Sequence, residues 1–176
     1  MFEFFECLSY LARLEAFSFL LGRLLAKKDI PWERLQITLI DSKKADDFYR
    51  LIKVGRWQKK VPDMSKIFTR IMPQKKITKD YRRLLPTMIK ETYIAEIVHI
   101  WLMFFGFKCC RIWKGLGGII ISVINVFGNL PFVIIQRYNR PRLIRLYERI
   151  NAAQTTEQGE KLYENTDTEL QHRTRS

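Results

Sequence analysis

The fold of this chain is decided by residues 91–143, ETYIAEIVHIWLMFFGFKCCRIWKGLGGIIISVINVFGNLPFVIIQRYNRPRL. Two glutamates and a histidine open this stretch inside an apolar run, and a short cationic link follows them. An uncharged apolar run then occupies residues 115–136, before the basic RYNRPRL. Because a helix needs about 20 predominantly apolar residues to cross a bilayer, the stretch predicts a hairpin of two spanning helices, at residues 91–110 and 115–136. Asn125 and Asn129 in the second run need polar partners, so their face is expected to point inward.

The composition is typical of a membrane protein with basic flanks. Of 176 residues 47% are hydrophobic, yet the formal net charge is +13, and the charged and apolar residues occupy different segments. In a soluble globule they would alternate along each element. The sequence has no helix-turn-helix, zinc-ligand or RNP-type pattern, so nucleic acid is not the expected partner. Membrane lipid with anionic headgroups, or an anionic acyl donor, is a better expectation.

Residues 4–25 are also apolar, but Arg13 and Glu15 lie near the middle of the run. A charged side chain at the centre of a bilayer costs about 3 kcal/mol even on the lenient scale. Two interpretations therefore stay open: a third span whose charged residues face other helices, or an amphipathic helix in the interface. We favour the span. The expected fold is then an all-α membrane protein with about three transmembrane helices.

Residues 26–90 form a basic segment that prolines divide into short pieces. Within it, residues 46–56 predict an amphipathic helix with Phe48, Leu51 and Ile52 on one side. A solvated loop that obeys the positive-inside rule is one explanation of the segment. The recurrent aromatic residues favour another, an amphipathic cap that lies on the cytoplasmic headgroups over a membrane-buried site.

The distribution of positive charge predicts the topology. The cap and a basic foot at residues 137–150 are expected in the cytoplasm, and the link between the hairpin helices outside. The protein is therefore predicted to be a multi-pass protein of the cell membrane. Residues 1–150 are expected to form one membrane-embedded domain, and the polar residues 151–176 a disordered, dispensable tail.

Glu96 and His99 are the first candidates for chemistry. They are three residues apart, and Thr92 precedes Glu96 by four, so all three lie on one helix face. A carboxylate beside an imidazole holds the ring in one tautomer and stabilises its protonated form, which suits a general base. Ionisable residues inside a span indicate function because they are costly there. Glu91 lies on an adjacent face, nearer the aqueous end; it is a further catalytic candidate or simply a favourable carboxylate in the first turn.

RYNRPRL presents guanidinium groups where a helix leaves the membrane, and Pro141 is expected to limit the continuation of that helix. Guanidinium groups bind phosphates and carboxylates in bidentate fashion. A positive-inside flank would need only charge, whereas the interleaved Tyr138, Asn139 and Pro141 indicate a shaped turn. The candidate substrate-binding residues in this block are Arg137, Asn139, Arg140 and Arg142.

Several classes of chemistry are excluded or disfavoured. The chain has no G-x-S-x-G, Cys-His-Asn set, P-loop, dinucleotide fingerprint or metal-ligand cluster. Its two histidines are His99 and His172, which excludes a histidine-rich metal site. We expect no metal and no bound cofactor. The three cysteines, Cys7, Cys109 and Cys110, make no disulfide framework and are read as small buried residues.

Three blocks of the sequence, KVGRWQKKVPD, ETYIAEIVHIW and NLPFVIIQRYNRPRL, resemble the glycosyl-4,4'-diaponeurosporenoate acyltransferase family. The resemblance runs from about residue 50 to about residue 149, and His99 fits the histidine of the family's E-T-x-x-A-E-x-x-H pattern. It implies a small bacterial membrane enzyme that esterifies the sugar of a carotenoid with a fatty acyl group. Trp57 and Asp63, in the first block, are expected to close the site and exclude water.

The resemblance implies transfer of an acyl group from acyl-CoA or a similar acyl thioester, used as co-substrate, to a sugar hydroxyl of a lipid-linked acceptor. A carotenoid glucoside, another glycolipid or a polyprenyl sugar would each suit the fold. In the mechanism we expect, His99 is oriented by Glu96 and deprotonates that hydroxyl. Two alternatives stay open: a non-enzymatic protein whose basic cap binds anionic lipid or a partner, and another small lipid-modifying transferase.

Overall fold

The part of the chain that the structure describes is almost entirely helical. This computed structural model describes residues 2–28, 31, 42–61 and 81–173. The long helices are α1 (Phe2–Lys27), α5 (Tyr81–Gly106) and α7 (Leu116–Arg173). The short elements are α2 (Ser42–Leu51), α3 (Val54–Trp57), the 3-10 turn η2 (Gln58–Lys60) and α6 (Cys109–Ile112). The all-α prediction is confirmed for these residues.

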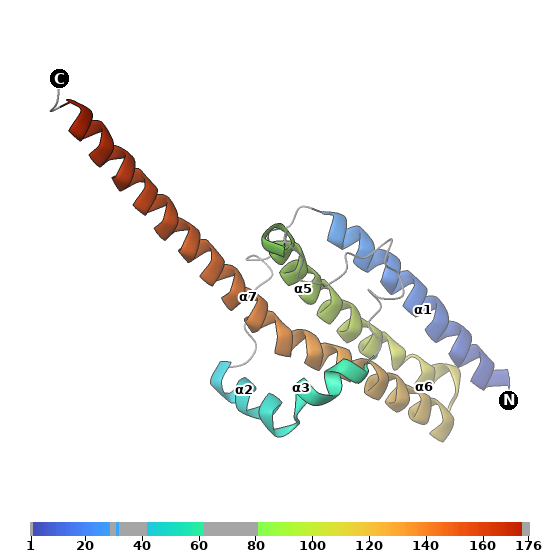
Figure 1. The fold of residues 1–176 in the computed structure, drawn as a ribbon. Helices are drawn as coiled ribbons and strands as arrows, with labels where there is room; N and C mark the ends of the chain where they lie inside the picture. The colour runs from blue at the N-terminus through green and yellow to red at the C-terminus, as the bar shows by residue number, and fades with distance from the viewer. Residues whose placement is uncertain (1, 29–30, 32–41, 62–80, 174–176) are drawn as a thin grey trace.

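Helices α5 and α7 form the expected hairpin, with α6 in the link between them (Figure 1). The two helices run antiparallel and make the most extensive helix–helix contact in the described part of the chain. Gly115 closes the link with a φ of 94°, a left-handed conformation that only glycine adopts without strain. Near the other end of the hairpin, Ile89 and Tyr93 of α5 pack against α7 residues, namely Leu143, Ile144 and Tyr147.

Helix α1 lies along α5 in the opposite direction, which completes a bundle of three long helices (Figure 1). At its start, Cys7 is buried with Cys109 and Ile121 beneath the α6 link. At its end, the Nζ of Lys90 donates to the carbonyl of Lys28 over 3.1 Å. These contacts fix both ends of α1 against the hairpin. All three cysteines are free thiols.

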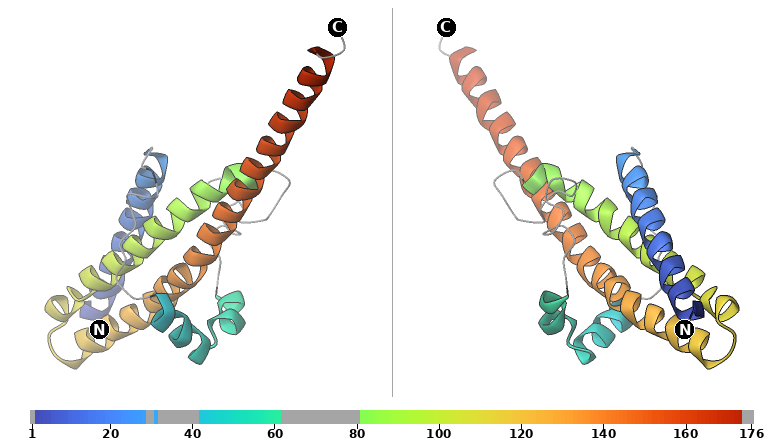
Figure 2. Two further views of the ribbon diagram at one scale, coloured as in Figure 1. Left: turned by 90° about the vertical axis from the view of Figure 1, so that its left-hand side faces the viewer. Right: turned by 90° about the vertical axis from the view of Figure 1, so that its right-hand side faces the viewer.

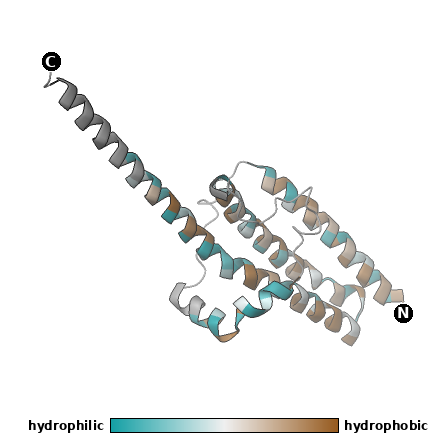
Figure 3. Cartoon of the chain, in the orientation of Figure 1, coloured by the Kyte–Doolittle hydropathy of each residue, from teal (hydrophilic) through white to brown (hydrophobic). Residues whose placement is uncertain are grey.

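The bundle exposes apolar side chains and carries polar residues between its helices. Large apolar side chains of all three long helices are exposed, among them Phe17, Phe104 and Phe127 at 56%, 70% and 67%. The buried polar residues instead face the neighbouring helices: Ser18, Thr92, Glu96, Ser122, Asn125, Asn129 and Gln136. Figure 3 shows the apolar colouring on the bundle and the hydrophilic colouring on α2, α3 and the middle of α7. The inward face predicted for Asn125 and Asn129 is confirmed.

Two helical segments, Arg83–Ile112 and Leu116–Thr156, are long and apolar enough to cross a membrane, judged by length and composition. They contain the predicted span at residues 91–110 and all but the first residue of the predicted span at 115–136. Helix α1 does not meet the same criterion among the described residues, and its sequence carries Arg13 and Glu15 near the middle. A third span therefore stays a prediction, as does the placement of the basic cap on the membrane.

The structure corrects the helix predicted at residues 46–56. Helix α2 ends at Leu51, and a turn at Lys53, with a φ of 51°, separates it from α3. The apolar face expected there is not buried, because Phe48 and Leu51 are 49% and 78% exposed. Tyr49 and Val54 are buried instead, since the turn changes which side chains can reach α7.

Helix α7 is also longer than predicted. It passes through Pro141 without ending and continues to Arg173, where the sequence had predicted a disordered tail after residue 150. Extending a formed helix avoids the cost of nucleating a new one. The added sequence contains no proline, and alanine, glutamine, glutamate, lysine and leucine in it all favour helix. Figure 2 shows this extension projecting away from the bundle.

Candidate active site

A buried carboxylate lies between α5 and α7. Glu96 on α5 is 7% exposed. Its Oε1 accepts a hydrogen bond from Nε of Arg137 over 2.5 Å, and its Oε2 accepts one from Nη2 of Arg140. Both arginines come from α7, three residues apart, so one helix face presents both guanidinium groups to the same carboxylate. A buried carboxylate is tolerated only when it is paired in this way.

Arg140 contacts several residues of α5. Its Nε donates to Oγ1 of Thr92 over 3.0 Å, and Nη2 donates to the carbonyl of Thr92 over 3.1 Å. The Thr92 hydroxyl donates in turn to the carbonyl of Ile89 over 2.7 Å. The guanidinium carbon lies 3.7 Å from the ring centroid of Tyr93. These contacts hold Arg140 in one orientation and make it part of the hairpin's packing.

His99, one turn further along α5, has a different partner from the one expected. Its Nδ1 lies 2.8 Å from Oδ1 of Asn129, and its ring stacks on Phe132 with centroids 4.6 Å apart. The two oxygens of Glu96 are bonded to the arginines of α7. The sequence-based expectation that Glu96 orients His99 is therefore wrong for this structure, because the antiparallel register brings α7 side chains to both residues.

The amide chain on α7 determines the tautomer of His99. The Nδ2 of Asn125 donates to the carbonyl of Leu102 over 3.0 Å, and Nδ2 of Asn129 donates to the carbonyl and Oδ1 of Asn125 over 2.9 Å and 3.2 Å. The Oδ1 of Asn129 is thus the acceptor that faces His99. An amide oxygen can only accept, so Nδ1 of His99 carries a proton. In the neutral ring, Nε2 is then the basic nitrogen.

The other candidate catalytic residue, Glu91, belongs to a separate contact. Its Oε1 lies 3.4 Å from Nη1 of Arg23, and the two side chains are 13% and 20% exposed. The pair joins α5 to α1. Glu91 precedes His99 by eight residues, which is about 12 Å along a helix. The structure therefore does not bring Glu91 together with His99.

The remaining candidates lie apart from Glu96. Nε1 of Trp57 donates to the carbonyl of Ile52 over 3.0 Å and so braces the turn before α3. Asn139 is half-buried on α7, and no hydrogen bond of its side chain is found among the described residues. Arg142 stacks on the ring of Tyr138 at 3.5 Å and donates to the Tyr138 carbonyl over 2.6 Å. Asp63 lies outside the described residues.

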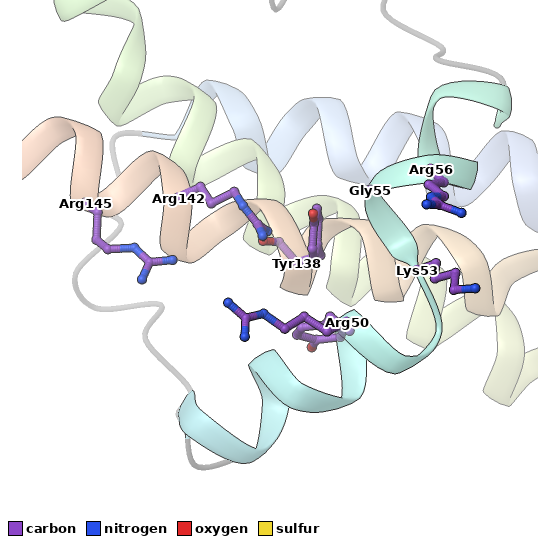
Figure 4. Close-up of a pocket in the computed structure, with 8 residues that line it drawn as sticks. Arg50, Lys53, Gly55, Arg56, Tyr138, Arg142 and Arg145 are labelled. Atoms are coloured by element: carbon purple, nitrogen blue, oxygen red, sulfur yellow. The ribbon is translucent and has the colours of Figure 1, made fainter.

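A cationic cavity of about 390 Å³ opens between the α2–α3 turn and α7 (Figure 4). The described residues that line it include five cations: Arg50, Lys53, Arg56, Arg142 and Arg145. Of these five residues, only Arg142 was among the substrate-binding residues predicted from the sequence. The others lie in segments rich in lysine and arginine, where a cavity cation looks like any other charge of a basic flank. Only the packing of α3 on α7 distinguishes these four residues from the other charges of the basic segments.

Together these features define a small helical protein with buried polar contacts between its helices, a histidine held by an asparagine and a cationic cavity. A family model described as glycosyl-4,4'-diaponeurosporenoate acyltransferase matches residues 28–149. The chain belongs to the glycosyl-4,4'-diaponeurosporenoate acyltransferase family. Both of the chain's helical hairpin runs and the α2–α3 segment fall within that match.

Relatives of the same description come from Staphylococcus aureus. The protein of strain MRSA252 is 33% identical over 97 residues, and those of strains N315 and USA300 are 32% identical over 97 residues. Each alignment covers 53% of this chain and 56% of the relative. The chain thus spans about half the length of the curated relatives it matches. No solved structure matches it.

Proposed function

We propose that this protein is a membrane acyltransferase that moves a fatty acyl group from an acyl thioester to a sugar hydroxyl of a glycosylated isoprenoid or carotenoid lipid. Membership of the family supports this reaction class. The single observation that carries the mechanism is the hydrogen bond from Nδ1 of His99 to Asn129, which leaves Nε2 basic. A partly buried imidazole held in one orientation is the group that general-base catalysis needs.

In the proposed reaction, Nε2 of His99 takes the proton of the acceptor hydroxyl as its oxygen attacks the thioester carbonyl. A C–O ester bond forms and the C–S bond breaks. The leaving thiolate then receives the proton from His99, so the base is restored. Asn129 holds the ring in the required tautomer. Glu96 supports the site by holding Arg137 and Arg140 in place, while its oxygens remain bonded to them.

The distribution of polar and apolar residues supports a bilayer location for this chemistry. Apolar side chains cover the outside of the bundle, and polar ones lie between its helices. In water that arrangement would expose large apolar patches. In lipid a buried polar group needs a partner within the protein, and Glu96, Asn125 and Asn129 each have one. We propose a multi-pass protein of the cell membrane with its basic regions in the cytoplasm, in which a lipid acceptor enters sideways between helices.

His99→Ala tests the catalytic role. In membranes that contain the protein, a glycosylated lipid acceptor and radiolabelled acyl-CoA, we expect kcat/KM to fall by about 10²–10⁴-fold, as for the loss of a general base. His172→Ala is the matched control, because it removes the chain's other histidine. Wild-type-like activity of His99→Ala, at equal amounts in the membrane, would remove His99 from the mechanism.

A second candidate function is favoured by the cationic cavity: a non-enzymatic protein that binds anionic lipid through its basic segment. It predicts that His99→Ala is silent and that exchanging basic residues at constant charge preserves function. Lipid mass spectrometry of cells with and without the protein separates the two functions. A lipid that gains the mass of one fatty acyl group supports the enzyme, and a gain of one methyl group indicates another lipid-modifying transferase.

A further inference from the structure

The cationic cavity has the composition of an anion site. Five cations line it, and Arg142 is fixed there by its stacking on Tyr138 and its bond to the Tyr138 carbonyl. The ion pairs found among the described residues involve Arg23, Arg137 and Arg140, and none of the five cavity cations. Gathering like charges around one cavity is unfavourable unless an anion joins them. The cavity of about 390 Å³ is in the size range of small-molecule sites.

The local fold gathers these charges from two elements. Tyr49 of α2 packs edge-to-face on Tyr138 of α7, with centroids 5.8 Å apart. Gly55 approaches so closely that a Cβ there would lie 2.8 Å from Oη of Tyr138. Lys53 adopts a left-handed conformation at the turn between α2 and α3. Strain at a non-glycine residue persists where packing imposes it, and such residues cluster at binding sites.

Figure 4 shows how the basic side chains approach the cavity. Arg50 extends from the end of α2 toward α7, whose Arg142 and Arg145 lie on the same side of the opening. Lys53 and Arg56 lie at the other end, next to Gly55. Guanidinium groups from opposite walls suit a ligand with more than one phosphate, because each phosphate can take a bidentate contact.

The cavity also lies at a useful distance from His99. Phe132, which stacks on His99, precedes Tyr138 by six residues on α7 and Arg142 by ten. At 1.5 Å per residue, the cavity therefore begins about 9–15 Å from the imidazole along the helix. A donor held there by its phosphates needs a long flexible arm to bring its acyl carbon to His99. A thioester on a pantetheine arm has that form.

We propose that this cavity binds the phosphates of the acyl donor's carrier, and that the donor is a coenzyme A thioester. The inference rests on the proposed function. It places the phosphate site in a cavity that Arg142 of the RYNRPRL block shares with the α2–α3 turn. Arg137 and Arg140 are engaged with Glu96. The phosphates of coenzyme A and of a phospholipid headgroup share the same chemistry, so the test has to separate them.

Arg145→Gln and Arg149→Gln form the test pair. Both residues are exposed on α7, one turn apart, and both variants lower the net charge equally, but only Arg145 lines the cavity. The probes are coenzyme A, inorganic pyrophosphate, dihexanoyl phosphatidylglycerol and dihexanoyl phosphatidylcholine, added to purified protein in micelles. Binding is measured by titration calorimetry. Arg50→Gln, on the opposite wall of the cavity, is the second variant. Because Arg50 belongs to α2, its effect cannot come from a local change in α7.

We expect Arg145→Gln and Arg50→Gln each to weaken coenzyme A binding at least tenfold, and Arg149→Gln to leave it unchanged. Pyrophosphate should compete with coenzyme A. Equal weakening by all three variants would mean that overall charge suffices and would overturn the proposal. A second result would also overturn the proposal: the protein binds phosphatidylglycerol but not coenzyme A, and Arg145→Gln weakens this binding while Arg149→Gln does not. The cavity would then hold a lipid headgroup.

Activity measurements keep this inference separate from the proposed function. We expect Arg145→Gln to raise KM for acyl-CoA with little change in kcat, since it removes binding remote from the reacting atoms. If the wild-type protein is active and neither Arg145→Gln nor Arg50→Gln changes the KM for acyl-CoA, the cavity assignment is overturned and the proposed function still stands. Tight coenzyme A binding by a protein that transfers no acyl group would support the cavity assignment and overturn the proposed function.

Discussion

Glu96 shows how a single residue can look catalytic in a sequence and act as a support in the structure. Its spacing from His99 is right for a base and its orienting carboxylate, but both of its oxygens are bonded to arginines of α7. Asn129, an uncharged residue 30 positions away, is the partner of His99 instead. An amide fixes the tautomer without placing a second charge beside the ring, which is the cheaper solution in a buried site.

At this scale we predict that Glu96→Gln lowers the free energy of unfolding by about 2–3 kcal/mol, because two guanidinium groups lose their counter-charge. Glu148→Gln, which changes an exposed carboxylate in the basic foot of α7, is the control and should change stability by less than about 0.5 kcal/mol. Thermal unfolding of the purified variants in detergent measures both. If Glu96→Gln abolishes acyl transfer while melting as the wild type does, Glu96 acts in the chemistry itself.

The elements of the hairpin approach one another closely at the link. Gly118, in the first turn of α7, faces the backbone of the α6 link. A Cβ there would lie 2.1 Å from the carbonyl oxygen of Trp113 and 2.6 Å from that of Cys109. Backbone atoms cannot rotate out of the way as a side chain does. The position of α7 relative to α6 therefore depends on the missing side chain.

We predict that Gly118→Ala disrupts the link and lowers the yield of folded protein, whereas Gly128→Ala on the same helix does not. A Cβ at Gly128 meets nothing within 4 Å, so this variant should gain up to about 1 kcal/mol from the better helix propensity of alanine. Thermal unfolding and fluorescence-detected size-exclusion chromatography compare the two. Equal stability of both variants would show that the link relaxes more easily than its contacts imply.

On the scale of the whole molecule, the long extension of α7 stands apart from the three-helix bundle (Figure 2). Residues 151–156 are exposed, and the ribbon beyond them leads away from the other helices. The buried polar contacts of the candidate site all lie before residue 143. The described contacts of the candidate site therefore come from residues that precede the extension.

Truncation after Thr156 should therefore preserve membrane retention, acyl transfer and coenzyme A binding. We expect the far-ultraviolet circular dichroism signal per molecule to fall with the residues removed, because they are helical rather than disordered. A truncated protein that loses its activity or its melting transition would mean that the extension supports the bundle. Unchanged ellipticity would instead favour the disordered tail predicted from composition.

The sequence by itself determined the helical class, the hairpin and its link, because long apolar runs and charged breaks act through local physics. It also marked His99, Glu96 and the arginines of α7, since ionisable residues in apolar surroundings are costly. Only the tertiary structure decided which of them are partners. Asn129 meets His99, the arginines meet Glu96, and Arg50 meets the cavity beside Arg142 through helix register and a left-handed turn at Lys53. Those contacts join residues far apart in the chain, and no local pattern encodes the distance between them.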